Sequence, residues 1–332
     1  MAIRELDETT ARRIGRRGLL QALGIGIGLV PVVKLLAACE DGAGVSGAGD
    51  VTDANDATAA DSTAADSTAA DSTAADSTAA DSTAADSTAA TAWATGGTAA
   101  MIAAASYPDP FTAGGTSCEL QCQSTIGPCH TGSTERQDVS DGWDGLPVRL
   151  ALRVVDAECQ PIEGAIVEIW HTNIAGIYSG NINAMCNDTA EQRAATFFRG
   201  WQRSDADGRV DFDTCFPGWY SGRAIHIHFR VQTGDYAAAD GAAAVVISQL
   251  FFPEALTSAI FADEPLYEDY GEPDTSLSSD NIVGGEDDKT PYVVDVARMS
   301  DGAMLASKTL VVRTDTATAN CSMKGASGGG MP

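Results

Sequence analysis

Residues 216–229 read FPGWYSGRAIHIHF, and the second half of this stretch indicates the fold. From Ile225 onward apolar and polar side chains alternate, which is the period of a β-strand. Side chains two residues apart in a strand project from the same face, so His226 and His228 share one face and Ile225 and Ile227 the other. Taken alone, this pattern fits either a pair of metal ligands on a rigid strand or a solvated outer face.

Strand-like runs of the same kind recur along the second half of the chain. They are rich in Val, Ile and Phe, and several alternate. Turn signals such as Asp207-Gly208 and Pro217-Gly218 separate them, and few long helical stretches compete. Short, evenly spaced strands predict an all-β fold, and specifically a β-sandwich. The predicted strands are 147–155, 164–172, 209–216, 224–232, 244–252, 292–298 and 307–313.

An acidic, small-residue segment precedes these strands. Residues 40–106 contain eleven Asp or Glu and no Lys or Arg, and residues 61–90 repeat Asp-Ser-Thr-Ala-Ala six times. This composition buries too little apolar surface to offset the entropy of ordering. We expect a disordered linker over 40–106, acting as a flexible tether, and one domain over 107–332. The formal net charge of −26 argues against nucleic-acid binding, because no basic patch exists to neutralise phosphates.

The first part of the chain has the layout of an export signal. In residues 1–39 a basic region precedes an apolar run at 19–36. The alternative is a transmembrane helix, but the run is short for a span and is interrupted by Pro31 and Lys34. We therefore expect residues 1–39 to be a signal peptide.

Two short motifs specify the type of signal. Residues 16–20 read RRGLL and resemble the twin-arginine export motif. Residues 36–39 read LAAC and resemble a bacterial lipobox, in which Cys39 becomes the lipidated N-terminus. We expect an exported protein of the cell envelope, held at a membrane by acyl chains on Cys39.

Seven further cysteines follow this motif, and their usage fits export. None of them shows the paired Cys-x-x-Cys spacing of a zinc site. In an oxidising compartment we expect up to three disulfides and one odd thiol, with the connectivity left open. The seven are Cys118, Cys122, Cys129, Cys159, Cys186, Cys215 and Cys321.

An ordered set of motifs surrounds the two histidines. Residues 167–173 read VEIWHTN, residues 176–180 read GIYSG, and residues 217–220 read PGWY ahead of the Arg-x-x-His-x-His pattern at 223–228. In this order the set resembles the intradiol ring-cleavage dioxygenases, the family of catechol, hydroxyquinol and protocatechuate dioxygenases. The resemblance covers residues 124–253, and it implies a β-sandwich of the intradiol dioxygenase type.

The resemblance also implies a mononuclear iron(III) cofactor bound by two tyrosines and two histidines. Carried over residue by residue, the ligands are Tyr178, Tyr220, His226 and His228. The chemistry is consistent, because iron(III) is a hard ion that anionic phenolate oxygen suits better than thiolate does. Bound metal also lowers the pKa of a phenol by direct charge interaction.

Three residues match catalytic positions of the family. The resemblance implies that a catechol and dioxygen are the substrates, and that the ring is cleaved between its two hydroxylated carbons. Tyr220 would act as the base that takes one catechol proton. Arg223 matches an arginine near the substrate that could stabilise negative charge on the ring, and Gln249 matches a glutamine near the pocket. A surface salt bridge for Arg223 and an ordinary strand position for Gln249 are the alternatives.

One departure from the family pattern concerns the start of the domain. Family members usually carry an aromatic residue after Gly-Pro, whereas Gly127-Pro128 is followed here by Cys129-His130. A disulfide from Cys129 is one way to hold this segment. His171 resembles a family position that is not a ligand, and we expect a structural role for it.

Two other functions are compatible with parts of the pattern. A non-catalytic β-sandwich lipoprotein could bind an aromatic ligand or a surface partner through the inherited ligand set. A copper or zinc site could use the two histidines, but zinc prefers Cys, His and carboxylates, so Tyr178 and Tyr220 argue against it.

Overall fold

The computed structural model describes residues 92–112, 118–238 and 244–328. The expected signal peptide with Cys39 and the repeats at 61–90 lie outside the described residues. No helix within the described ranges is both long enough and apolar enough to cross a membrane.

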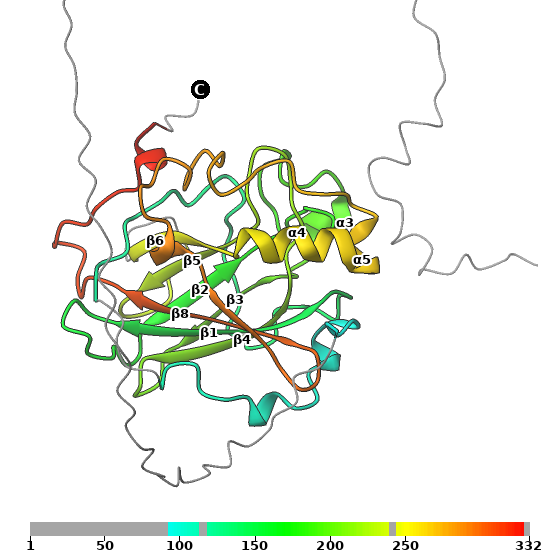
Figure 1. Cartoon of the computed structure of the whole chain (residues 1–332). Helices are drawn as coiled ribbons and strands as arrows, with labels where there is room; N and C mark the ends of the chain where they lie inside the picture. Colours follow the sequence, from blue (N-terminus) through cyan, green and yellow to red (C-terminus); the bar gives the residue numbers. More distant parts are fainter. Residues whose placement is uncertain (1–91, 113–117, 239–243, 329–332) are drawn as a thin grey trace, which may run out of the picture. The chain divides into compact units, whose positions relative to one another are not determined.

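The described residues form two four-stranded sheets that pack face to face (Figure 1). The strand order is β4-β1-β8-β7 in the first sheet and β3-β2-β5-β6 in the second. Strand β1 pairs in parallel with β8, and the other pairs within both sheets are antiparallel. The predicted all-β sandwich is therefore confirmed. The strands are β1 (Pro147–Val155), β2 (Ile166–Trp170), β3 (Arg199–Arg203), β4 (Arg209–Cys215), β5 (His226–Gln232), β6 (Ala244–Phe251), β7 (Asp295–Arg298) and β8 (Met304–Val311).

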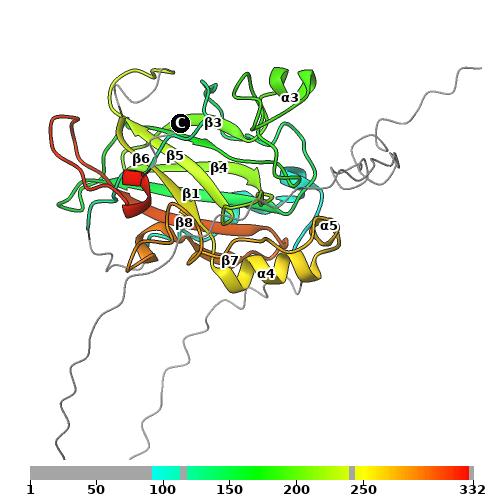
Figure 2. The same cartoon turned by 90° about the horizontal axis from the view of Figure 1, so that it is seen from above.

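Helices are short and lie at the margins of the sandwich. In the view of Figure 2, α4 lies next to β7, and Ile260 of this helix packs into the core between the sheets. The segment between β6 and β7 contains α4, α5 and a long loop. The helical segments are η1 (Gly97–Ala100), η2 (Ala104–Ser106), α3 (Ala190–Ala194), α4 (Glu254–Asp263), α5 (Pro265–Glu268), η3 (Thr290–Tyr292) and η4 (Lys324–Gly328).

Strand β3 was not predicted from the sequence. Its residues read RGWQR, so it lacks the alternation of apolar side chains that identifies a half-buried strand. It forms an edge of the second sheet and pairs only with β2 there. On its other side, within the described residues, only an isolated bridge joins Trp201 to Glu135. A strand at the edge of a sheet needs less apolar surface than a central strand, which explains why the pattern did not reveal it.

The core lies between the two sheets, and β5 shows how the pattern of alternation places it. Ile227 and Phe229 are fully buried among the apolar side chains that the two sheets share. His226 and His228 project from the opposite face of the second sheet, as the alternation predicted. They are also buried, at 3% exposure each, because loops cover this outer face. The solvated-face alternative is therefore excluded.

Three disulfides connect six of the seven cysteines in the described ranges. They join Cys118 to Cys159, Cys122 to Cys321, and Cys129 to Cys186. The seventh, Cys215, is a buried free thiol. The expectation of up to three bridges and one odd thiol is confirmed. Cys129, which stands where the family usually has an aromatic residue, is held by a disulfide.

The folded part of the chain begins earlier than we expected. Trp93 packs against the main core, and its ring lies 4.0 Å from the guanidinium carbon of Arg298. The backbone N–H of Gly97 donates to the carbonyl of Gly145 at 2.9 Å. Residues 92–106 thus pack on the sandwich rather than extending the linker to position 106. The single aromatic residue of this segment supplies the apolar surface that the repeats lack.

Candidate metal centre

The outer face of the second sheet brings the two strand histidines together. On β5 the Nε2 atoms of His226 and His228 lie 3.2 Å apart. His228 stands opposite Trp170 of β2 and opposite Gln249 of β6 in the sheet register. The Trp170 indole stacks on the His228 ring, with centroids 4.8 Å apart and planes 9° from parallel. The neighbouring strands β2 and β6 therefore fix the position of this imidazole from both sides.

Two loops bring the tyrosines to the same point. Tyr178 follows β2, and Tyr220 lies between β4 and β5. Both phenol oxygens lie 3.3 Å from Nε2 of His226. Gly176 makes this approach possible: its φ is +75°, and a Cβ there would lie 2.1 Å from the carbonyl oxygen of Trp219. The Gly-x-Tyr motif thus lets one tyrosine loop pack against the backbone of the other.

The two tyrosines differ in exposure and in backbone contacts. Tyr178 is 2% exposed, and its backbone N–H donates to the carbonyl of Cys186 at 3.2 Å. Its own carbonyl accepts from the side chain of Asn187 at 3.1 Å. Tyr220 is only half-buried. Of the two residues, Tyr220 is therefore the more exposed.

Burial controls the ionisation of this group. It raises the pKa of the Tyr178 phenol well above its usual value and also raises the pKa of Tyr220. Burial and then the nearby charge of Arg223 lower the pKa of His226 to about 3. Burial and the neighbouring His226 hold the pKa of His228 well below its usual value. Near neutral pH both imidazoles are neutral, which is the form in which histidine binds a metal.

The orientation of His226 follows from one backbone contact. Its Nδ1 lies 2.6 Å from the carbonyl oxygen of Ala224, and since a carbonyl can only accept, Nδ1 carries the proton. The lone pair therefore lies on Nε2, which faces both phenols. On His228 the Nδ1 atom is buried and has no hydrogen-bond partner among the described residues. Gly127 closes over that ring, because a Cβ there would lie 3.4 Å from Cε1 of His228.

The four donor atoms fit a small, hard cation. They are two phenol oxygens and two imidazole nitrogens, and each lies within 3.3 Å of Nε2 of His226. Ligands bonded at about 2.0–2.1 Å to one ion are separated by roughly 3 Å, so the spacing matches a shared metal. The described residues contain no group of three or more His, Cys, Asp or Glu that could hold a metal. Phenolate donors select against zinc and suit a ferric ion.

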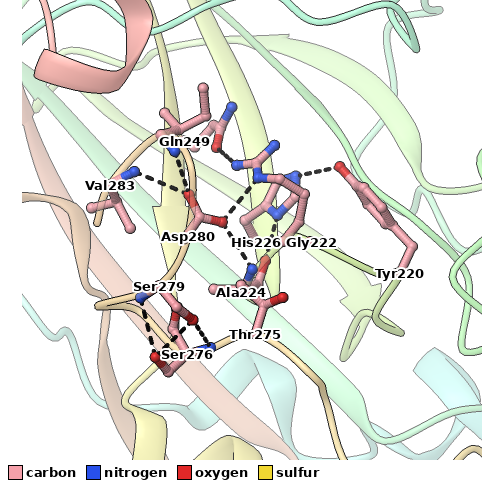
Figure 3. A network of polar contacts seen from close by, with 12 residues as sticks. Tyr220, Gly222, Ala224, His226, Gln249, Thr275, Ser276, Ser279, Asp280 and Val283 are labelled. Atoms are coloured by element: carbon pink, nitrogen blue, oxygen red, sulfur yellow. Dashed lines mark hydrogen bonds and ion pairs between the residues drawn. The ribbon is translucent and has the colours of Figure 1, made fainter. Parts of the chain in front are cut away.

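A second group of polar side chains lies beside these donors (Figure 3). Arg223 donates through Nε to Oδ2 of Asp280 at 2.9 Å and through Nη2 to Oε1 of Gln249. The Nε2 amide nitrogen of Gln249 is buried and has no described partner. The structure therefore brings Arg223 and Gln249 together, as residues of one site should be. Arg223 does form a salt bridge, although with a buried carboxylate, and Gln249 does lie on strand β6, so a role of either residue in catalysis stays a prediction.

Asp280 is the site residue that sequence reasoning missed. It is buried, and it lies 57 residues beyond Arg223, in the loop between α5 and β7. No short motif surrounds it, and its stretch resembles no strand or helix start. In the sequence, Asp280 stands out only as an acidic residue without a basic residue nearby. Such residues are too common to identify a site.

The Cys129-His130 departure also becomes clear in three dimensions. The disulfide from Cys129 reaches Cys186, whose carbonyl accepts from the backbone of Tyr178. His130 meets the edge of Trp170 with ring centroids 4.7 Å apart, and its Nε2 lies 3.2 Å from Oε2 of Glu168. This segment therefore forms the wall behind the His228 ring.

A buried ion pair extends this wall. Nη2 of Arg230 lies 2.5 Å from Oε2 of Glu168, and both side chains are fully buried. The phenol of Tyr236 donates to Oε1 of Glu168 at 2.8 Å. Burial alone would raise the pKa of Glu168, but the hydrogen bond to His130 and the charge of Arg230 lower it.

His171 takes no part in the donor cluster, as expected. Its Nδ1 lies 2.8 Å from the carbonyl oxygen of Thr172, and its Nε2 lies 2.7 Å from Oγ1 of Thr214. Burial lowers the pKa of His171 to about 4, so it is a neutral, fully bonded core residue.

Comparison with known proteins agrees with this geometry. Residues 124–255 match a protein-family model described as "Dioxygenase". That interval contains the four donors, Arg223 and Gln249, but it ends before Asp280. Sequence relatives include catechol 1,2-dioxygenase 1 of Acinetobacter lwoffii, 26% identical over 114 residues, which are 29% of this chain and 35% of the relative. The protocatechuate 3,4-dioxygenase beta chain of Burkholderia cepacia is 30% identical over 125 residues, 35% of this chain and 47% of the relative.

The chain thus spans between a third and a half of the length of these curated relatives. Among solved structures, an intradiol ring-cleavage dioxygenase from Tetranychus urticae is similar over nearly its whole length. It is 27% identical, with a TM-score of 0.50, and the match covers 59% of this chain and 95% of that one.

Proposed function

We propose that this chain, whose residues 124–255 are a domain of the intradiol ring-cleavage dioxygenase family, is a non-haem iron(III) dioxygenase. Its substrate would be a catechol-type ring, cleaved between the two hydroxylated carbons with incorporation of dioxygen. One observation carries this proposal: the phenol oxygens of Tyr178 and Tyr220 and Nε2 of His228 all lie within 3.3 Å of Nε2 of His226.

Tyr178, Tyr220, His226 and His228 would hold the iron. When bound there, iron(III) would supply Lewis-acid chemistry and a template for the two catechol oxygens. The protein's part is to keep the donors in place and water out. Stacking by Trp170 and the bond from His226 to the Ala224 carbonyl orient the two imidazoles.

Tyr220 is the residue that we assign as the proton acceptor. It is half-buried, whereas Tyr178 is enclosed and bonded through its backbone on both sides. A phenolate at position 220 can therefore swing toward an arriving catechol hydroxyl and take its proton. Tyr178 would stay in place throughout.

Arg223 and Gln249 are the residues that we assign to the substrate. The guanidinium places positive charge beside Tyr220, where negative charge develops as the catechol loses its protons. The unpartnered Nε2 of Gln249 is a second donor in the same region. Because both groups are fixed by mutual contact, they need little reorganisation during the reaction.

Export and lipid anchoring form a second part of the proposal. The signal at residues 1–39 and the lipobox ending at Cys39 would place the domain on the outer side of a membrane, in the cell envelope. Three disulfides within the described residues support this, because such bonds persist in oxidising compartments.

The decisive experiment is metal analysis of the full chain purified without a His tag. We expect about one iron per chain and a visible absorption band from tyrosinate-to-iron charge transfer, together with consumption of dioxygen when catechol is added. A colourless protein with stoichiometric zinc would exclude the iron site. A coloured iron protein that never consumes dioxygen with any catechol would favour the non-catalytic aromatic-binding alternative.

A further inference from the structure

Arg223 is the cation whose charge reaches every candidate iron ligand. Burial dominates the pKa shifts of Tyr178, Tyr220, His226 and His228, and the positive charge of Arg223 acts on all four of them. A charged substituent on a ring bound at these ligands would therefore also lie in the electrostatic field of Arg223 and of the group that neutralises it.

Asp280 already neutralises it. Oδ2 of Asp280 accepts from Nε of Arg223 at 2.9 Å and from the backbone N–H of Ala224 at 2.8 Å. Oδ1 accepts from the backbone N–H groups of Ile282 at 2.8 Å and Val283 at 3.0 Å (Figure 3). Four donors on one fully buried carboxylate keep it ionised and give it no freedom to turn away.

Gln249 occupies a second nitrogen of the same guanidinium. Recognition of a carboxylate by arginine uses two parallel N–H groups on one edge. Nε of Arg223 donates to Asp280, and Nη2 donates to Gln249. Both pairs of neighbouring nitrogens that could bind a carboxylate, Nε with Nη2 and Nη1 with Nη2, therefore include a nitrogen that already bonds the protein. The guanidinium is therefore poorly placed to grip a substrate carboxylate.

A second arginine near the site is also committed. Arg199 is 2% exposed, and its charge acts on two of the candidate ligands. Its Nε donates to Oγ of Ser179 at 3.0 Å, its Nη1 to the carbonyl of Thr131 at 3.3 Å, and its Nη2 to the carbonyls of Cys129 and Ser179. All three nitrogens already donate to protein oxygens, so Arg199 is poorly placed to grip a substrate carboxylate with two parallel N–H groups.

We propose that the Arg223–Asp280 pair is a specificity determinant that selects catechols without a ring carboxylate. This inference rests on the proposed function and names the substrate class within it. A ring carboxylate would enter a low-dielectric site near a fixed anion, and neither arginine would offer it an unused pair of N–H groups to offset the loss of its hydration. The net charge of −26 disfavours anionic ligands further at long range.

The test compares three ligands of the iron-loaded full chain without oxygen. They are catechol, protocatechuate, and protocatechuamide, which has the same ring with a neutral amide in place of the carboxylate. Titration of the visible charge-transfer band gives each Kd without turnover. We expect the amide to bind at least about tenfold more tightly than the acid, because the carboxylate of the acid is repelled by the buried carboxylate of Asp280.

Equal or tighter binding of protocatechuate would overturn the inference while leaving the proposed function intact. If none of the three ligands changes the spectrum, the proposed function itself fails, and the inference fails with it.

Variants then locate the cause. Asp280→Asn keeps the size and an oxygen that can accept from Ala224, but it removes the charge, so the preference for the amide should fall toward onefold. Asp274→Asn is the matched control, because Asp274 is an exposed acid of the same loop that bonds Gly222 at 3.2 Å. It should leave the preference unchanged. Equal ratios in wild type and Asp280→Asn would refute the role of Asp280.

A second variant covers the case in which Asp280→Asn disrupts its loop. Arg223→Gln retains the buried carboxylate and removes the cation, so discrimination against protocatechuate should increase. A gain in protocatechuate affinity in that variant would contradict the inference.

Discussion

The backbone N–H of Tyr178 donates to the carbonyl of Cys186 at 3.2 Å, so a proposed iron ligand and a disulfide are direct neighbours. Through Cys129 the same disulfide reaches the segment in which Gly127 covers the His228 ring. One covalent bond therefore joins the loop that carries a proposed phenol ligand to the segment that packs on a proposed imidazole ligand.

Loss of this disulfide should weaken retention of iron at the proposed metal site. We expect the double variant Cys129→Ala/Cys186→Ala to lose iron faster to a chelator than wild type and to show a shifted visible band. The matched control is Cys118→Ala/Cys159→Ala, whose loop of 41 residues is comparable with the 57 of the first. Each removal should destabilise the fold by about 2–5 kcal/mol. Identical iron loss in both variants would show that general stability, rather than the position of the disulfide, controls retention.

Removal of the Tyr220 hydroxyl should impair catalysis more than iron binding. Tyr220→Phe keeps the ring volume and leaves three protein ligands, so iron content should stay close to one per chain. Loss of the proton acceptor should reduce kcat by roughly 10²–10⁴. His226→Ala, by contrast, should lose most of the iron, because Nε2 of His226 contacts the other three donors. Tyr270→Phe is the control for removing a phenol hydroxyl elsewhere. Wild-type turnover in Tyr220→Phe would rule out Tyr220 as the base.

The buried pair of Glu168 and Arg230 should make stability depend on pH. The pKa of Glu168 is lowered in the folded protein from 4.5, so its stabilising contribution is present above that pH and is lost as the pH falls through the folded value. Glu168→Gln should reduce the free energy of unfolding at pH 7 by about 3–5 kcal/mol, because it removes the charge that compensates a buried guanidinium.

Chemical denaturation at a series of pH values measures this effect. The acid-induced fall in stability should be shallower in Glu168→Gln than in wild type. Glu163→Gln changes an exposed glutamate and should alter the free energy of unfolding by less than about 0.5 kcal/mol. Parallel pH profiles for wild type and Glu168→Gln would show that this pair does not contribute to the acid sensitivity.

Replacement of Cys39 should separate export from anchoring. Cys39→Ser keeps the preceding signal but removes the thiol that would be acylated, so we expect an exported protein that no longer sediments with membranes. Fractionation after a high-salt wash, with immunodetection, measures the difference. A variant that remains with the membrane fraction would require a different anchor.

Much of the site could be predicted because most of its residues belong to short contiguous sequence motifs. The alternation at 225–229 assigned His226 and His228 to one face of a strand, and the structure confirms that assignment. The motif around Tyr178 includes Gly176, whose positive φ allows the two tyrosine loops to touch. Strand geometry acts over a few residues, so the shared face of the two histidines can be read without the fold, whereas the contact of Gly176 with Trp219 becomes visible only in the structure.

Other features could not be predicted in this way. The edge strand β3 lacks apolar alternation, and the packing of Trp93 moved the start of the folded part from 107 back to 92. Both depend on which surface the segment meets, and that surface is formed by distant parts of the chain.

By itself the sequence determined the class of fold and the upper limit of three disulfides, because these follow from periodicity and from the number of cysteines. Its resemblance to a known family supplied the expected donor set. Only the tertiary structure decided which cysteines pair, and that Asp280 holds Arg223 across 57 residues of chain. Such contacts join segments without any common local pattern. They are selected by the packing of the whole domain, where a buried charge must find its partner wherever the fold places one.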